Sequence, residues 1–363
     1  MEFLYETLLQ VTWQQAVMWV IGGVLIFLAI KKDMEPSLLL PIGFGAILVN
    51  LPLSGAVETL DTLYTAGIAN ELFPLILFIG IGAMIDFGPL LSNPKLMLFG
   101  AAAQFGIFFT FAMAALLGFD IRDAASIAVI GAADGPTSIF VANFLNSQYL
   151  GPIIVAAYSY MALVPIVQPP VIRALTTKHE RRIRMGYTGT KVTKRTKILF
   201  PIFVTILTGI VSPRAVALIG FLMFGNLLRE CGVLDALSET AQKVLANLIT
   251  LLLGITVASK MTADAFLNWQ TLMILGLGLV AFIFDTVGGV LFAKLLNLFC
   301  KNKINPMIGA AGISAFPMSA RVVHKMGLAE DNQNFLLMHA VGVNVSGQIA
   351  SVIAGGMILG FFG

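Results

Sequence analysis

The chain has 363 residues, of which 58% are hydrophobic and only 11% are charged, and its mean hydropathy is +0.91. Soluble domains carry about 25% charged residues, so a soluble chain of this composition would expose a large apolar surface and aggregate. The composition therefore excludes an ordinary soluble protein. It predicts an all-α, polytopic membrane protein whose helices cross a bilayer.

Apolar runs follow one another along the whole chain, and many have the ~15 to 25 residues needed to cross a hydrocarbon core of about 30 Å. The first is expected to be a retained span, because Lys31 and Lys32 follow it, whereas a signal peptide would place them before it. Several other runs are short or rich in glycine, so we expect about 9–11 membrane segments. The runs cover 16–30, 38–53, 72–87, 96–118, 124–145, 150–172, 198–211, 213–228, 244–258, 270–300, 304–323 and 335–361.

The net charge is only +3, but the basic residues are concentrated in the segment 173–197. This segment holds nine of the 22 Lys and Arg residues, and Glu180 is its only acid. Short loops rich in Lys and Arg stay on the cytoplasmic side of a membrane, and anionic lipid heads would attract them to the same side. We therefore expect a cytoplasmic loop. No aromatic or helix-turn-helix pattern accompanies the charge, so nucleic acid is not expected as a partner.

Two parts of the chain repeat each other at a nearly constant offset, 177 residues for one short motif and 178 for another. The matching motifs are Gly43-Phe44 with Gly220-Phe221, and Ile130-Gly131-Ala132-Ala133 with Ile308-Gly309-Ala310-Ala311. Such self-similarity indicates duplication. The predicted organisation is an N-terminal span at 1–37, a first repeat at 38–172, the basic loop 173–197 as a linker, and a second repeat at 198–363.

Each repeat contains a segment, 131–138 or 309–317, in which Gly and Pro interrupt an apolar run. Inverted-repeat transporters place their ion site where two such discontinuous helices meet near the middle of the bilayer. Broken backbone is tolerated there only where protein or a water-filled cavity covers the freed N–H and C=O groups, which are then available to ions. We expect this architecture, with the two segments close together. Kinked packing helices with close glycine contacts are the alternative.

Asp134 lies within the first broken segment, in an otherwise apolar run. A carboxylate at that depth costs several kcal/mol unless it is paired, protonated or bound to a cation. It could also cap a helix that has Pro136 in its first turn. Both roles can hold together, because a helix cap inside the membrane already requires a broken helix.

The corresponding segment of the second repeat runs from Asn305 to Arg321 and contains no carboxylate. On a straight helix Asn305 and Ser314 would lie on opposite faces, but breaks near Gly309 and before Pro317 would let both face one cavity. Arg321 has no acidic partner in this segment. It is therefore able to bind an anionic substrate, unless it simply extends to the lipid headgroups.

Further polar groups lie in other apolar runs. Tyr160 could be an interfacial aromatic residue, and Asn344 and Ser346 could make only interhelical hydrogen bonds. The buried set nevertheless offers hard oxygen ligands of low total charge, which suit Na⁺, and lacks the His and Cys ligands of a transition metal. The candidate Na⁺ ligands are Asp134, Asn305, Gly309, Ser314, Asn344 and Ser346.

Four motifs in order resemble the β subunits of sodium-pumping, biotin-dependent decarboxylases, which act on oxaloacetate, methylmalonyl-CoA, glutaconyl-CoA or malonate. The likeness covers essentially the whole chain, although the N-terminal region is shorter than in the oxaloacetate members, which slightly favours an acyl-CoA system. The motifs are GAMIDFGPLLSNP at 82–94, GAADGPT at 131–137, NPxxGAAGIS at 305–314 closing on Arg321, and NVSG at 344–347.

The resemblance implies an enzyme of the bacterial inner membrane. A carboxyltransferase α subunit would load biotin on a carrier protein, and this chain would decarboxylate the carboxybiotin, consume a proton and export Na⁺. A small single-span γ or δ subunit is implied as a further partner, and a homo-oligomer is left open. The functional positions implied are Asp134, Tyr160, Asn305, Gly309, Ser314, Arg321 and Asn344.

The implied roles agree with the chemistry of these side chains. Arg321 would hold the anionic N-carboxylate, with Asn305 beside it, and Tyr160 or Ser314 would donate the proton. Asp134 would alternate between Na⁺ and a proton. The rival hypothesis is a secondary cation antiporter or organic-anion transporter of the same architecture without chemistry. A passive membrane anchor would need neither Asp134 nor Arg321.

Overall fold

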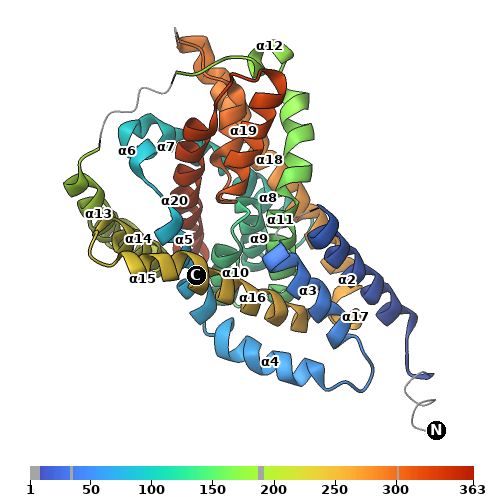
Figure 1. Ribbon diagram of the computed structural model, residues 1–363. Helices are drawn as coiled ribbons and strands as arrows, with labels where there is room; N and C mark the ends of the chain where they lie inside the picture. Colours follow the sequence, from blue (N-terminus) through green and yellow to red (C-terminus); the bar gives the residue numbers. More distant parts are fainter. Residues whose placement is uncertain (1–8, 33–35, 187–191, 301) are drawn as a thin grey trace.

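A computed structural model describes residues 9–32, 36–186, 192–300 and 302–363, and these residues form helices and no strand (Figure 1). The all-α fold expected from composition is thereby confirmed. Residues 187–191, including Lys191 of the basic loop, lie outside the described residues, as do residues 1–8 of the predicted N-terminal span.

Many of the helices are short and are separated by short 3-10 segments, and η4 (Ala241–Leu245) is a π-helical segment. In the first half they are α2 (Trp13–Lys32), α3 (Pro36–Val49), α4 (Ala56–Gly67), α5 (Leu72–Met84), α6 (Gly88–Ser92), η1 (Pro94–Leu96), α7 (Met97–Ala103), α8 (Phe105–Leu116), α9 (Ile121–Ala128), η2 (Val129–Ala132), α10 (Gly135–Phe144), α11 (Leu150–Leu175) and α12 (Lys178–Arg181). In the second half they are α13 (Lys194–Val211), η3 (Pro213–Ala215), α14 (Val216–Glu230), α15 (Asp235–Thr240), η4 (Ala241–Leu245), α16 (Ala246–Val257), η5 (Ala258–Lys260), α17 (Ala263–Phe266), α18 (Trp269–Phe299), η6 (Pro306–Gly312), α19 (Met318–Glu330) and α20 (Leu337–Phe362).

Six helical stretches of the described chain are long and apolar enough to cross a membrane, so the protein is a multi-pass membrane protein. A bent pair, α4 with α5, meets the same test when its two helices are taken together, with an angle of 62° between them. The expected 9–11 segments include shorter pieces, so that number stays a prediction. The six are Trp13–Lys31, Pro94–Leu116, Leu150–Leu175, Asp235–Lys260, Trp269–Phe299 and Leu337–Phe362.

Helices from the two halves pack reciprocally. α3 and α14 carry the repeated Gly-Phe motif, and α3 packs on α16 of the second half whereas α14 packs on α5 of the first. The α5–α14 contact is made backbone to backbone: a Cβ on Gly82 would lie 1.9 Å from the Leu222 carbonyl oxygen. Small residues at a crossing allow this approach in membrane helices. This exchange of partners is what an inverted repeat would produce, although the symmetry itself stays a prediction.

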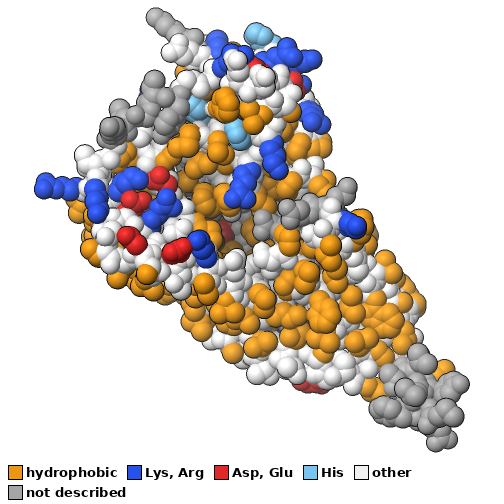
Figure 2. All heavy atoms as spheres, in the orientation of Figure 1, with side chains coloured by type: hydrophobic (Ala, Val, Ile, Leu, Met, Phe, Trp, Pro, Cys, Tyr) orange, Lys and Arg blue, Asp and Glu red, His pale blue; other side chains and the backbone are white. Residues whose placement is uncertain are grey.

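The basic loop is tied to the C-terminal end of α19. The Arg181 Nε donates to Glu330 Oε1 at 2.6 Å, and the Arg184 Nε donates to Asp331 Oδ2 at 2.6 Å. The Arg184 guanidinium lowers the pKa of the Asp331 carboxyl, since it stabilises the charged form. α12, in this loop, lies at the top of the molecule in Figure 1, and α4 lies at the opposite end. Figure 2 shows Lys and Arg side chains gathered around the upper end, with apolar side chains over much of the lower surface.

Candidate functional site

The chain leaves helical geometry at both of the segments interrupted by Gly and Pro. After η2, Ala133 adopts a left-handed conformation with φ of 52° and Asp134 is extended, before α10 begins at Gly135. After η6, Ile313 is extended, and α19 begins only at Met318. The Ser314 N–H donates to the Ala132 carbonyl oxygen at 3.0 Å, so the two segments are in contact, as expected.

Asp134 is 3% exposed and stands at the N-terminus of α10. Its Oδ2 accepts hydrogen bonds from Thr137 Oγ1 at 2.6 Å, Gln348 Nε2 at 3.1 Å and Ser351 Oγ at 3.4 Å. No salt bridge to Asp134 occurs within the described ranges. Among the described residues the carboxylate is therefore held by neutral donors alone, and no basic side chain compensates its charge.

α20 supplies the other wall of this site. Asn344, Gln348 and Ser351 follow one another at helical spacing on one face of α20, and the last two reach Asp134. Asn344 is fully buried and donates through Nδ2 to the Ile313 carbonyl oxygen at 2.7 Å, while its Oδ1 has no hydrogen-bond partner in the described part of the chain. A buried amide oxygen without a partner, one helical turn from a residue that binds Asp134, is a candidate ligand for a hard cation.

Sequence reasoning missed Gln348 and Ser351 as site residues. The spacing of polar residues at 344, 348 and 351 in an apolar run was the signal that could have found them, because positions i, i+4 and i+7 share a helix face. Ser346 lies off this face. Its Oγ donates to the Leu96 carbonyl oxygen at 2.9 Å, on the side of α7.

Ser314 lies within the contact between the segments, whereas Asn305 and Gly309 do not reach Asp134. The Ser314 Oγ donates to the Gly347 carbonyl oxygen at 3.0 Å. The Asn305 amide accepts from Met307 N–H and donates to the carbonyls of Arg181 and Ile183, so it joins η6 to the basic loop. Gly309 packs directly against Gly289 of α18. Both positions therefore have a structural explanation in this conformation.

The two remaining candidates occupy different surroundings. Tyr160 is on α11 and donates its hydroxyl to the Leu275 carbonyl oxygen, whereas the neighbouring Tyr158 packs its ring against Gly135, next to Asp134. Arg321 lies in the first turn of α19, directly after the second break. It is exposed and forms no ion pair with any described residue.

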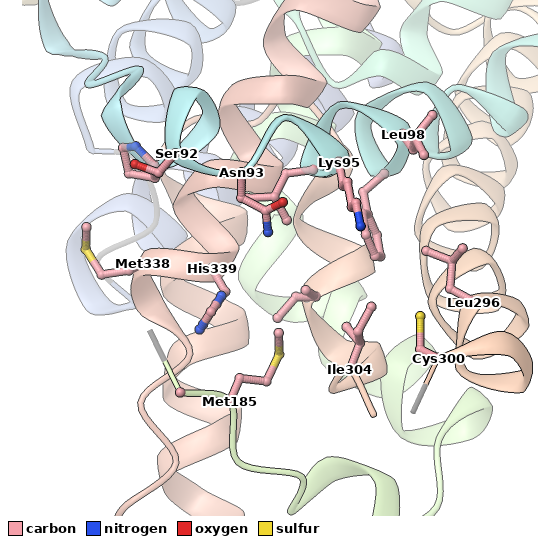
Figure 3. Close-up of a pocket in the computed structure, with 15 residues that line it drawn as sticks. Ser92, Asn93, Lys95, Leu98, Met185, Leu296, Cys300, Ile304, Met338 and His339 are labelled. Carbon is pink, nitrogen blue, oxygen red and sulfur yellow. The ribbon is translucent and has the colours of Figure 1, made fainter. Parts of the chain in front are cut away.

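A cavity of about 400 Å³ lies between the turn before α7 and the C-terminal end of α18, beside the basic loop. Figure 3 shows Asn93 and Lys95 entering it from one side, with Met185 and His339 on the other. Most of the remaining wall is apolar, from residues such as Leu296 and Ile304. A pocket with an apolar body and a few polar groups suits a small organic molecule.

Comparison with known proteins gives the family of the chain. Residues 14–362 match the family described as "Na+-transporting oxaloacetate decarboxylase beta subunit". The chain belongs to this family. It is 50% identical to the methylmalonyl-CoA decarboxylase subunit beta of Propionigenium modestum, across 96% of this chain and 94% of that protein. The expectation drawn from the four motifs is confirmed.

Two further relatives show the range of acids served by the family. The glutaconyl-CoA decarboxylase subunit beta of Acidaminococcus fermentans is also 50% identical, across 97% of this chain and 94% of the relative. The oxaloacetate decarboxylase beta chain of Klebsiella pneumoniae is 46% identical, across 95% and 94% respectively. The chain is therefore similar over nearly its full length to β subunits of complexes that decarboxylate different acids.

Proposed function

We propose that this chain decarboxylates carboxybiotin presented by a biotin carrier protein and couples the reaction to export of Na⁺. The observation that carries the proposal is Asp134, a buried carboxylate at a helix break whose partners among the described residues are neutral hydrogen-bond donors. Such a group in a membrane requires an ion or a proton. Membership of a family of Na⁺-transporting decarboxylase subunits supports the same conclusion.

The proposed Na⁺ site consists of the Asp134 carboxylate and the unpaired Asn344 Oδ1, with carbonyl oxygens of the two broken segments nearby. Gln348 and Ser351 hold Asp134 in position through hydrogen bonds. One negative charge with neutral oxygens suits a monovalent cation, because more carboxylates would favour a divalent one. Asn305, Gly309 and Ser346 do not lie against Asp134 in this conformation, so their proposed role is to support the surrounding segments.

Arg321 is the proposed ligand for the N-carboxylate of carboxybiotin, since its planar guanidinium pairs with a carboxylate through two parallel hydrogen bonds. In the reaction the C–N bond breaks, CO₂ leaves, and the electron pair stays on the ureido nitrogen, which takes up a proton. Ser314, at the contact between the two segments, and Tyr160 are the proposed donors. Release of CO₂ must depend on ion occupancy, because moving one charge against 100 mV costs about 2.3 kcal/mol.

The proposed setting is a complex in the bacterial inner membrane. A carboxyltransferase α subunit loads the biotin carrier, which approaches from the cytoplasmic side near the basic loop. A small single-span subunit completes the complex, and further copies of this chain could join it. The apolar face of α2, with Val20, Phe27 and Ile30 exposed, is available to lipid or to such a subunit.

The acid that feeds the complex is proposed to be an acyl-CoA. The alignment with the glutaconyl-CoA relative is 355 residues long and covers 97% of this chain, so it is almost free of gaps. The alignment with the Klebsiella oxaloacetate relative covers 95% of this chain but is 409 residues long, so it contains many more gaps. Because the β subunit would handle only carboxybiotin, assay of the assembled complex with each acyl-CoA and with oxaloacetate is the direct test.

Na⁺ uptake into inverted vesicles tests the proposed coupling. Vesicles containing the reconstituted complex should accumulate radioactive Na⁺ when carboxylated carrier is supplied, and not when the carrier is uncarboxylated. A secondary antiporter or organic-anion carrier would transport equally well in both cases. Transport that is independent of carboxybiotin would therefore reject the proposal.

A further inference from the structure

A second buried carboxyl group, Asp285, lies in the middle of α18, the longest span. It is 0% exposed, and neither carboxyl oxygen has a hydrogen-bond partner of ordinary geometry among the described residues. The N–H groups of Gly106 and Ile107, at the start of α8, lie beside it without reaching that geometry. A carboxyl group buried in a membrane in this way costs free energy, and such residues commonly mark functional positions.

Among the residues that the structure describes, no basic side chain forms an ion pair with Asp285. The sequences of α7, α8, η2 and η6, which pack around this part of α18, contain no ionisable residue. The other charged residue of α18 is Lys294, which pairs with Glu180 at 3.2 Å. On α9, Arg122 is exposed at the surface, and Asp123 is held by Ser147 and Gln148. On α11, Tyr160 donates to the Leu275 carbonyl oxygen. Asp285 must therefore be neutralised by a bound ion.

The space around the Asp285 carboxyl group is large enough for a proton but too small for a hydrated cation or for a cation with several oxygen ligands. A Cβ on Gly106 would lie 2.4 Å from Asp285 Oδ1, and a Cβ on Gly131 would lie 3.2 Å from Oδ2. Backbone thus presses on the carboxyl group from two sides. Cations such as Na⁺ need several oxygen ligands around them, whereas a proton needs only the carboxyl oxygen.

Asp285 also lies against the segment that contains Asp134. Gly131 belongs to η2 and stands three residues before Asp134. One turn further along α18, Gly289 packs on Gly309 of η6. α18 therefore contacts both segments of the proposed Na⁺ site, with its carboxyl group on the side of η2.

We propose that Asp285 is a proton-binding site in the membrane core that supplies the proton consumed when carboxybiotin is decarboxylated. This inference rests on the proposed function. As CO₂ leaves, the donor hydroxyl of Ser314 or Tyr160 gives its proton to the ureido nitrogen and takes up the proton that the Asp285 carboxyl releases. The Asp285 carboxylate is then reprotonated from the opposite side of the membrane. Protonated carboxyl groups are the usual relay elements of membrane pumps.

The test compares Asp285→Asn with Thr286→Val in the reconstituted complex. Asn keeps the shape and neutrality of the protonated acid but releases no proton, so turnover should fall about tenfold or more, whereas Thr286→Val should stay within about twofold of wild type. Na⁺ should still protect both variants from proteolysis. Infrared spectra should show the carbonyl band of a protonated carboxylic acid in wild type that is absent from Asp285→Asn.

Three results would overturn the inference: wild-type turnover in Asp285→Asn, no difference in that infrared band, or loss of Na⁺ protection in Asp285→Asn, which would make the group structural. Failure of the proposed function gives a different pattern. The wild-type complex would then not decarboxylate carboxybiotin, while the infrared comparison would still decide whether Asp285 carries a proton.

Discussion

Asp134 has a structural role at a helix start and a proposed functional role as a cation ligand. At the start of α10 a carboxylate is favoured by the helix dipole, and its hydrogen bonds from Thr137, Gln348 and Ser351 fix its orientation. These neutral donors stabilise the charge only in part, because the site is almost completely buried. The remaining charge is what would make the site selective for a cation.

Asp134→Asn should abolish coupled activity. The variant keeps the shape and much of the hydrogen bonding but removes the countercharge of a buried cation, which is worth several kcal/mol, so turnover should fall by at least about 100-fold. Asp134→Glu should retain more activity. The measurements are decarboxylation rate and protection by Na⁺ from proteolysis. An Asp134→Asn protein that still turns over with Na⁺ stimulation would show that Asp134 is only a helix cap.

Arg321→Lys should weaken use of carboxybiotin while leaving Na⁺ protection intact. Lys keeps the charge but loses the two parallel hydrogen bonds, so the KM for the carboxylated carrier should rise about tenfold. Lys325→Gln, one turn further along α19 and also exposed, is the matched control and should change little. If Lys95→Gln raised KM and Arg321→Lys did not, the cavity beside Lys95 would be the carboxylate site instead.

Individual residues show which parts of the candidate site could be predicted from the sequence and which could not. Asp134 and Ser314 could be selected from the sequence, because polar groups at Gly- and Pro-interrupted positions in apolar runs are costly and therefore informative. Asn305 shows the same pattern, yet its amide is fully used by the backbone of η6 and of the basic loop. Which backbone groups a side chain reaches depends on contacts more than 100 residues away in the chain, and no local pattern contains that information.

At the scale of elements, glycine determines how closely the helices approach. Gly289 of α18 and Gly309 of η6 face each other so closely that a Cβ on either would lie about 2 Å from the carbonyl oxygen of the other. The repeat pattern identified Gly309 as a position in a broken segment. Its partner could not be found from sequence, because α18 contains four glycines with similar apolar surroundings.

Gly289→Ala should destabilise the protein, because the added methyl group would lie 2.1 Å from the Gly309 carbonyl oxygen. Overpacking of this kind costs roughly 1–3 kcal/mol. Gly276→Ala, on the same helix with no atom within 4 Å of the new Cβ, should be neutral or stabilising by up to about 1 kcal/mol. Thermal unfolding in detergent measures both. Equal melting temperatures for the two variants would contradict the tight contact between α18 and η6.

For the whole molecule, composition and apolar runs were enough to predict a multi-pass, all-α membrane protein, and four motifs were enough to place it in its family. The number of membrane spans could not be predicted from the apolar runs. The run 124–145 divides at Ala133 and Asp134, directly before Gly135 and Pro136, whereas the run 96–118 divides at Gln104, which is neither Gly nor Pro. Tertiary contacts take over the freed backbone groups. Apolar length alone does not tell a straight span from a bent or interrupted one.

The orientation of the molecule follows from its charge and can be tested directly. Lys178, on α12 in the basic loop, and Thr65, on α4, are exposed positions at opposite ends of the bundle (Figure 1). The concentration of Lys and Arg in 173–197 predicts that α12 is cytoplasmic and α4 is on the other side. In a background with Cys231 and Cys300 replaced by Ala, Lys178→Cys should react with a membrane-impermeant maleimide only in inside-out vesicles. Thr65→Cys should react only in intact cells with a permeable outer layer. The reverse pattern would invert the topology and, with it, the side from which carboxybiotin is proposed to enter.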